Sequence, residues 1–126
     1  MEKELSDING RFQSGKHNQA IDEIQGLIEK FSLDDEIYRA HARLGHYINY
    51  MGKHSEAVDA WAKALSLLED TNGNIDHLAE DKFVDWINIS LEKARVMHRQ
   101  GKYPFALPIA ILFFFSNRTR WIRCIA

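Results

Sequence analysis

A short turn motif occurs three times in the chain and constrains its fold more than any other feature. The motif reads glycine, lysine, an aromatic residue or histidine, two variable residues and alanine, and it starts at Gly15, Gly52 and Gly101. Each copy lies between stretches whose apolar residues recur every three or four positions, the period of one face of an α-helix. Glycine accepts the left-handed conformation with which many helices end. The pattern therefore predicts a repeated helix–turn–helix unit.

The middle copy has the clearest helical period. The predicted inner face of the helix before its turn consists of Ile37, Ala40, Leu44, Ile48 and Met51. The predicted inner face of the helix after it consists of Ala57, Trp61, Ala64 and Leu68. Apolar residues at these steps bury one side of a helix, so the two segments predict an antiparallel hairpin.

The outer copies follow the same pattern. In the first copy the expected inner faces are Leu5, Ile8 and Phe12, then Ala20 or Ile21, Ile24, Leu27 or Ile28, and Phe31. In the third copy they are Phe83, Ile87, Leu91, Ala94 and Met97 or His98, followed by a returning helix over residues 105–115. We therefore expect an all-α fold.

Composition sets the broad class of the protein. Hydrophobic residues make up 45% of the chain, which is enough for a packed core and argues against disorder. The single cysteine, Cys124, allows no internal disulfide and fits a reducing compartment. The charged start of the chain has no apolar stretch typical of a secretory signal. We expect a cytoplasmic protein.

The stretch from Ala40 to Ala64 resembles one tetratricopeptide repeat (TPR). In that family small residues lie where two helices touch, as Gly45, Ala57 and Ala64 would here, and large apolar residues such as Trp61 fill the remaining gap. The resemblance implies an α-solenoid of about three antiparallel hairpins in a right-handed superhelical stack. The repeats would lie near residues 2–31, 35–70 and 76–115, so that the repeat domain spans 1–102 and the third repeat continues into the C-terminal segment 103–126. Ile8, Arg11 and Glu69 depart from the family pattern.

The resemblance also implies a function, because TPR proteins bind a peptide or helix of a partner in a concave groove lined by the first helix of each repeat. The polar residues in phase with that surface are Asn9, Gln13, Arg39, Arg43, His46, Asn49, Tyr50, Asn88, Arg95 and Arg99. Arginine pairs well with carboxylates, so we expect an acidic peptide or a free C-terminal carboxylate as ligand. A solvated helical face is the alternative for these residues.

The sequence gives no sign of an enzyme or of a cofactor. His41 and His46 are five residues apart and do not share a helical face, and a single cysteine excludes the cysteine-pair zinc patterns. No phosphate-binding glycine loop and no nucleophile motif occurs. We therefore predict no catalytic residues, no metal and no cofactor, and an adaptor or scaffold function, with an accessory or regulatory domain of a larger protein as an alternative.

The last 24 residues differ in character from the rest. Residues 103–115 are almost wholly apolar and residues 116–126 are basic. This segment has three interpretations. It is an atypical last helix whose apolar outer face drives self-association, a tail that tethers the adaptor to a membrane, or a truncated or alternative end. Thirteen apolar residues are fewer than the ~20 that a spanning helix needs.

The charge distribution bears on nucleic acid. Residues 93–126 contain 7 Lys/Arg and no Asp/Glu, whereas residues 1–92 contain 18 Asp/Glu and 9 Lys/Arg. Arg118, Arg120, Trp121 and Arg123 combine charge with an aromatic ring, which suits a single strand. The basic stretch is short and the remaining chain is acidic, so we do not expect nucleic-acid binding.

Overall fold

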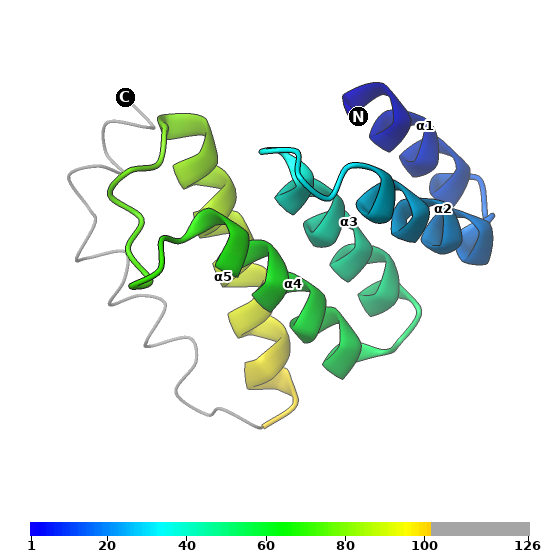
Figure 1. Ribbon diagram of the computed structural model, residues 1–126. Helices are drawn as coiled ribbons and strands as arrows, with labels where there is room; N and C mark the ends of the chain where they lie inside the picture. Colours follow the sequence, from blue (N-terminus) through cyan, green and yellow to red (C-terminus); the bar gives the residue numbers. More distant parts are fainter. Residues whose placement is uncertain (102–126) are drawn as a thin grey trace. The chain divides into compact units, whose positions relative to one another are not determined.

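All regular secondary structure that the computed structural model describes, over residues 1–101, is α-helical (Figure 1). The helices are α1 (Glu2–Gln13), α2 (His17–Lys30), α3 (Ile37–Tyr50), α4 (His54–Leu68) and α5 (Glu80–Arg99). The prediction of an all-α fold is confirmed for this part of the chain. The predicted helix over 105–115 and the segment 103–126 lie outside the described residues.

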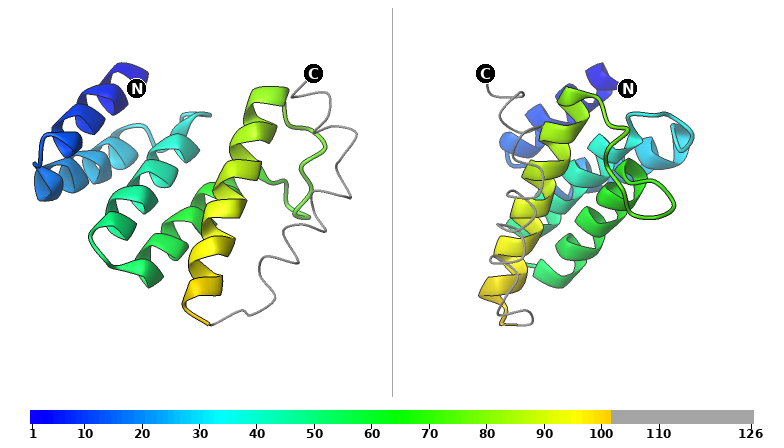
Figure 2. Two further views of the ribbon diagram at one scale, coloured as in Figure 1. Left: turned by 180° about the vertical axis from the view of Figure 1, so that it is seen from behind. Right: turned by 90° about the vertical axis from the view of Figure 1, so that its left-hand side faces the viewer.

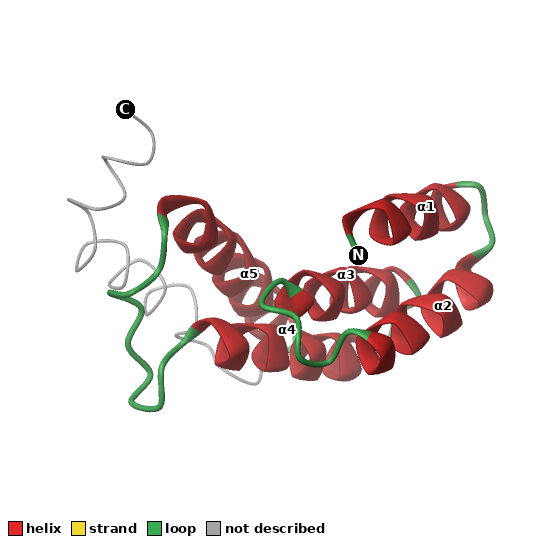
Figure 3. Cartoon of the chain, turned by 45° about the horizontal axis from the view of Figure 1, so that its top comes forward, coloured by secondary structure: helices red, strands yellow, loops and turns green. Residues whose placement is uncertain are grey.

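The chain divides into two compact units, of which the first is Met1–Ala64 and the second begins at Leu65. In the first unit, α1 packs on α2 and α2 packs on α3, and the chain reverses direction at each turn (Figure 2). The helices of this unit and the loops between them are distinguished in Figure 3.

The turn between α1 and α2 is closed by backbone hydrogen bonds. Gly15 has a φ of 98°, and its N–H donates to the Phe12 carbonyl at 3.1 Å. The N–H of Lys16 donates to the Arg11 carbonyl at 3.1 Å, and the Lys16 carbonyl accepts the N–H of Ala20 at 3.0 Å. A bond five residues back closes many helix C-termini. Lys16 therefore ends one helix with its N–H and starts the next with its carbonyl.

The turn between α3 and α4 has the same bonds. Gly52 has a φ of 85°, and its N–H donates to the Asn49 carbonyl at 3.0 Å. The N–H of Lys53 donates to the Ile48 carbonyl at 3.1 Å, and the Lys53 carbonyl accepts the N–H of Ala57 at 3.1 Å. The first two copies of the sequence motif therefore adopt one backbone geometry. In the third, Gly101 follows α5 with a φ of 71°.

The core of the first unit consists of the apolar faces of α1, α2 and α3. Its buried members are Ile8, Ala20, Ile24, Leu27, Ile37, Ala40 and Tyr47. The partly buried residues packed against them include Leu5, Phe12, Ile21, Ile28, Phe31 and Leu44. The inner faces predicted for α1 and α2 are confirmed.

Arg11 joins the first two helices at the edge of this core. Its Nε donates to Glu23 Oε2 of α2 at 2.7 Å, and its guanidinium forms an ion pair with the same oxygen. Gln19 donates to the other carboxylate oxygen at 2.8 Å. These bonds to Arg11 and Gln19 lower the pKa of Glu23. A partly buried ion pair therefore links α1 to α2.

The contact between α3 and α4 is centred on Trp61, which is 0% exposed. The indole lies against Gly45, where a Cβ atom would be 2.6 Å from Cδ1 and 2.9 Å from Cε2 of the ring. The indole N–H donates to the Ala42 carbonyl at 3.2 Å. Ala57 and Ala64 are also fully buried. The small-against-large packing predicted for this hairpin is present.

The predicted face of α3 needs two corrections. Met51 is 40% exposed, because α3 ends at Tyr50 and Met51 lies in the turn. Tyr38 and Tyr47 are buried although the sequence analysis did not assign them to the core. Tyrosine can be buried when its hydroxyl has a hydrogen-bond partner, and Asn9 accepts such a bond from Tyr47.

In the second unit, α5 is buried over a wider arc than predicted. The residues expected inside include Phe83, Ile87 and Ala94, which are buried. Of the alternatives Met97 and His98, Met97 is half-buried and His98 is exposed. Trp86, Ile89 and Val96 are buried as well. At 3.6 residues per turn, these residues together cover about half of the helix circumference.

A structured loop connects α4 to α5. The Asp70 carboxylate accepts the backbone N–H groups of Asn72 at 2.9 Å and Asn74 at 2.8 Å, and these bonds lower the pKa of Asp70. Ile75 and Leu78, later in the same loop, are buried. Hydrogen bonds to the Asp70 carboxylate and the burial of Ile75 and Leu78 therefore both fix the conformation of the loop.

Candidate functional site

Side chains from α1 and α3 contact each other along the first unit. The Tyr47 hydroxyl donates to Asn9 Oδ1 at 3.2 Å. The ring of Phe12 stacks on that of Tyr47, with centroids 4.0 Å apart and an interplanar angle of 13°. At the other end, Arg39 Nη1 lies 4.0 Å from Glu2 Oε1. The first helices of the first two hairpins are therefore neighbours.

Seven predicted groove residues belong to these two helices, and we call them the α1–α3 surface. Its exposed members are Gln13, Arg43, His46 and Tyr50, and its half-buried members are Asn9, Arg39 and Asn49. Asn9, Arg39 and Tyr50 make side-chain contacts between α1 and α3 or with the turn after α1. His46 packs its ring instead against Trp61 of α4, with centroids 5.6 Å apart.

The two arginines of the α1–α3 surface differ in their partners. Arg39 Nε lies 2.9 Å from Glu36 Oε2 and donates to the Tyr38 hydroxyl at 3.3 Å. Arg43 is exposed, and no hydrogen bond or ion pair within residues 1–101 engages its side chain. Burial raises the pKa of Tyr47, and the Arg43 cation opposes that effect, so the charge lies near the Tyr47 hydroxyl. Arg43 is the arginine of this surface that is free to bind an external anion.

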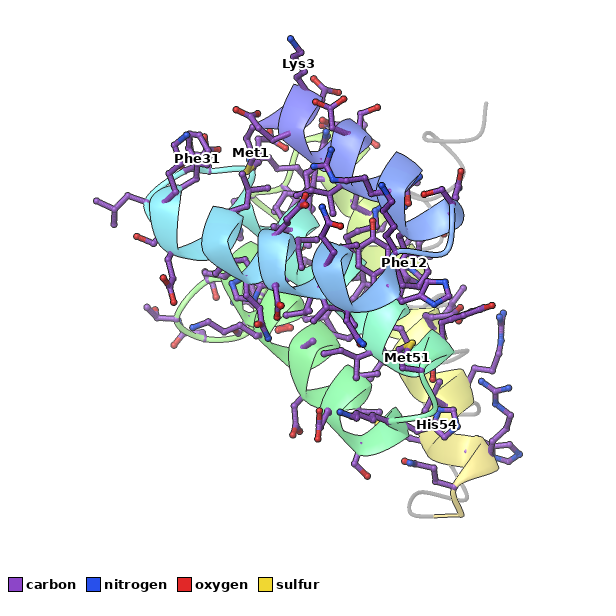
Figure 4. All side chains as sticks on the ribbon, turned by 90° about the vertical axis from the view of Figure 1, so that its right-hand side faces the viewer. Met1, Lys3, Phe12, Phe31, Met51 and His54 are labelled. Atoms are coloured by element: carbon purple, nitrogen blue, oxygen red, sulfur yellow. The ribbon has the colours of Figure 1, made fainter. Side chains whose placement is uncertain are left out.

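An aromatic cluster lies at the α1–α2 end of the same surface and consists of Phe12, His17, Tyr47 and Tyr50. The ring centroid of Tyr50 is 5.4 Å from that of Phe12, edge to face, and 5.0 Å from that of His17. Phe12 and His17 are 4.5 Å apart. Phe12 is labelled in Figure 4 at the end of α1. Tyr50 is 69% exposed, so a positioned aromatic ring is presented to solvent.

Sequence reasoning missed three members of this cluster. Phe12 is predicted on the inner face of its helix, whereas Tyr47 and His17 belong to no predicted face or groove. Tyr47 lies three residues before Tyr50 and four after Arg43, which places all three on neighbouring positions of one helix side. That spacing was the available signal.

Asn49 is engaged within the turn after α3. A hydrogen bond of 2.6 Å joins His54 Nδ1 to Asn49 Oδ1. His17 and His54 hold the same position in the first two motif copies, and each contacts the helix that precedes its turn. Both histidines therefore connect a turn to the helix that precedes it.

The remaining predicted groove residues lie on α5. Asn88, Arg95 and Arg99 are exposed, and Arg95 Nη1 lies 3.2 Å from Glu92 Oε2. They belong to the second unit. A basic groove that combines them with Arg39 and Arg43 therefore stays a prediction.

Within residues 1–101, no three or more histidine, cysteine, aspartate or glutamate side chains are grouped so that they could hold a metal ion. Among the helices of the same residues, none has the length and apolar character required to cross a membrane. The apolar segment 103–115, on which the membrane-tether alternative depends, is outside this range.

The titration of His41 is expected to make the stability of the first unit depend on pH. Burial lowers the pKa of the half-buried His41, and the Lys63 cation of α4 lowers it further. The folded state disfavours protonated His41. The free energy of unfolding is therefore highest above the unfolded pKa of about 6.5, and it falls as the pH drops below that value. We expect a lower urea midpoint at pH 5.5 than at pH 7.5.

The variant His41→Gln provides the control for this measurement. It removes the titrating group, so the urea midpoint should change less between the two pH values than in the wild type. The carboxylates with lowered pKa, Glu4, Glu23 and Asp70, titrate at lower pH and contribute little in this window. An equal pH dependence in the variant would show that His41 is not responsible.

Comparison with known proteins adds no family assignment. None of the protein-family models, the curated proteins or the solved structures gives a significant match to the chain. The resemblance to tetratricopeptide repeats is therefore one of sequence pattern alone, carried by the residues between Ala40 and Ala64.

Proposed function

We propose that this protein is a protein–protein interaction module of the adaptor or scaffold type, which binds a peptide or helix of a partner on the α1–α3 surface. In this proposal its hairpins stack as TPR-like repeats, and the module acts in the cytoplasm. The observation that carries the proposal is the exposed, unpaired Arg43 on the same side of α3 as the exposed ring of Tyr50.

The chemistry of these two residues supports a protein ligand. Arginine and tyrosine are enriched among the residues that contribute most to binding energy at protein interfaces. A free guanidinium binds a carboxylate in a bidentate, charge-assisted manner, so the ligand is expected to be acidic. Tyrosine supplies a large contact area at little cost in conformational entropy.

The proposal is tested by selecting a display library of random peptides on the full chain. We expect enrichment of acidic peptides. The selected peptides are then synthesised, and their affinities are measured for wild type, Arg43→Glu and Lys30→Glu. Reversing the charge at Arg43 should weaken binding by about tenfold or more, or ~1.4 kcal/mol.

Lys30→Glu is the control, because Lys30 is also an exposed helical cation but lies on α2, outside the predicted groove. It should leave affinity within about twofold of wild type. If Arg43→Glu and Lys30→Glu weaken binding equally, the ligand is attracted by net charge and the α1–α3 surface is not the site. If no peptide is enriched, Arg43 and Tyr50 belong to a solvated face and the proposal fails.

A further inference from the structure

The α1–α3 surface presents two different binding groups at a fixed separation. Arg43 and Tyr50 are seven residues apart on α3, which is two helical turns or about 10 Å along the axis. The Tyr50 ring is held by Phe12 and His17, so ligand binding need not order it. A ligand that uses both groups must place a negative charge and a ring about 10 Å apart.

A third group lies beside α3 between these two. The carbonyl oxygen of Asn9 accepts a hydrogen bond from the Tyr47 hydroxyl. The amide nitrogen of Asn9 carries two hydrogens that can be donated, and nothing within residues 1–101 accepts them. A ligand lying between Arg43 and Tyr50 therefore meets a hydrogen-bond donor.

The donor at Asn9 distinguishes between the backbone conformations that a ligand could have. The backbone carbonyls inside an α-helix are already bonded within the helix. A polyproline II segment has a free, solvated backbone with three residues per turn and a rise of 3.1 Å per residue. In that conformation side chains three positions apart lie on one side, about 9.3 Å from each other, close to the spacing of Arg43 and Tyr50.

We propose that the α1–α3 surface recognises a polyproline II peptide segment that carries a carboxylate and an aromatic side chain three positions apart. The carboxylate pairs with Arg43, the aromatic ring packs on Tyr50, and a backbone carbonyl between them accepts a hydrogen bond from Asn9. This inference rests on the proposed function and specifies the class of ligand. Charge complementarity with the unpaired Arg43 orients the peptide along α3.

The test is a titration of the full chain, observed by NMR amide shifts, with nine-residue peptides of one proline- and serine-rich background. Each peptide carries one glutamate and one tryptophan, separated by two, three, four or seven positions, in both orders. We expect the tightest binding at a separation of three, with a Kd about tenfold below that at two or four, and with shifts in α1 and α3.

Variants connect each ligand group to its site. In Arg43→Ala, replacing the peptide glutamate by glutamine should no longer change Kd. In Tyr50→Ala, replacing the peptide tryptophan by alanine should no longer change Kd, whereas Tyr50→Phe should bind as wild type does. Leu33→Ala is a control for general apolar attraction, because Leu33 is 97% exposed in the α2–α3 loop, and it should have no effect.

The outcomes separate this inference from the proposed function. Equal Kd values at all separations, tightest binding at seven, or no shifts in α1 and α3 would each overturn the polyproline II motif. If peptides from the random library still bind in an Arg43-dependent manner, the interaction module stands and only the motif is wrong. If they do not, both proposals are wrong.

Discussion

Trp61→Ala is expected to reduce the free energy of unfolding by about 3–5 kcal/mol, the usual range for a buried tryptophan. Trp61 is fully buried, and its removal leaves a cavity between α3 and α4 next to Gly45, which has no side chain to fill it. The variant also loses the hydrogen bond from the indole to the Ala42 carbonyl. Urea unfolding followed by circular dichroism measures the effect.

Leu33→Ala is the control for Trp61→Ala. It removes a large apolar side chain that is almost wholly in solvent, so the free energy of unfolding should stay within about 0.5 kcal/mol of wild type. A loss below ~1 kcal/mol for Trp61→Ala would contradict the central role of the α3–α4 contact.

Gly45→Ala is expected to destabilise the protein by about 1–3 kcal/mol, although alanine is the better helix former. A Cβ atom at this position would lie within 3 Å of the Trp61 ring. Ring and helix must then move apart, and neither is a flexible chain end. The same urea unfolding experiment applies to this variant.

The chain contains matched controls for this substitution. Gly10 and Gly26 are also helical, and a Cβ atom at either would meet nothing within 4 Å. Gly26→Ala should therefore stabilise the protein by about 0.5–1 kcal/mol. In addition, Gly45→Ala should cost less in a Trp61→Leu background, because the smaller side chain leaves room for the methyl group. Equal changes in the free energy of unfolding for Gly26→Ala and Gly45→Ala would show that the Trp61 ring does not stay in close contact with position 45.

The sequence allowed the helical segments and much of the core to be predicted, for a physical reason. Ala57, Trp61 and Ala64 lie on one stripe of α4 and are all fully buried, because a helix with a single packed side follows its hydrophobic period. The glycines of the motif have positive φ as expected. A glycine that a turn requires and a helix with one buried side can both be recognised in a single sequence.

Tyr47 and Trp86 were not predicted because their burial depends on tertiary partners. Tyr47 is tolerated inside through a bond to Asn9, which is 38 positions away in the chain. Trp86 lies on a side of α5 that its apolar period does not single out. Periodicity identifies one face of a helix, and it underestimates burial wherever a helix is covered on more than one side.

The candidate site was predicted in outline only. Helical phase correctly placed Arg43, His46 and Tyr50 among the exposed residues of α3. The helical phase of a residue does not show that Arg39 is paired with Glu36 while Arg43 is free. Such pairing depends on side-chain rotamers and on which carboxylates lie nearby. The contacts of Tyr50 with Phe12 and His17 likewise depend on the packing of α1 beside α3.

The double role of Lys16 and Lys53 determines where this protein can vary in length. One added residue in either turn would separate the N–H that ends a helix from the carbonyl that begins the next, so insertions there should be poorly tolerated. The motif copies are nevertheless 37 and 49 residues apart. The extra length is found in the loop from 69 to 79 and in α5, which has 20 residues against 14 in α3. Lineages of such chains should therefore gain and lose residues between hairpins and keep each hairpin corner constant.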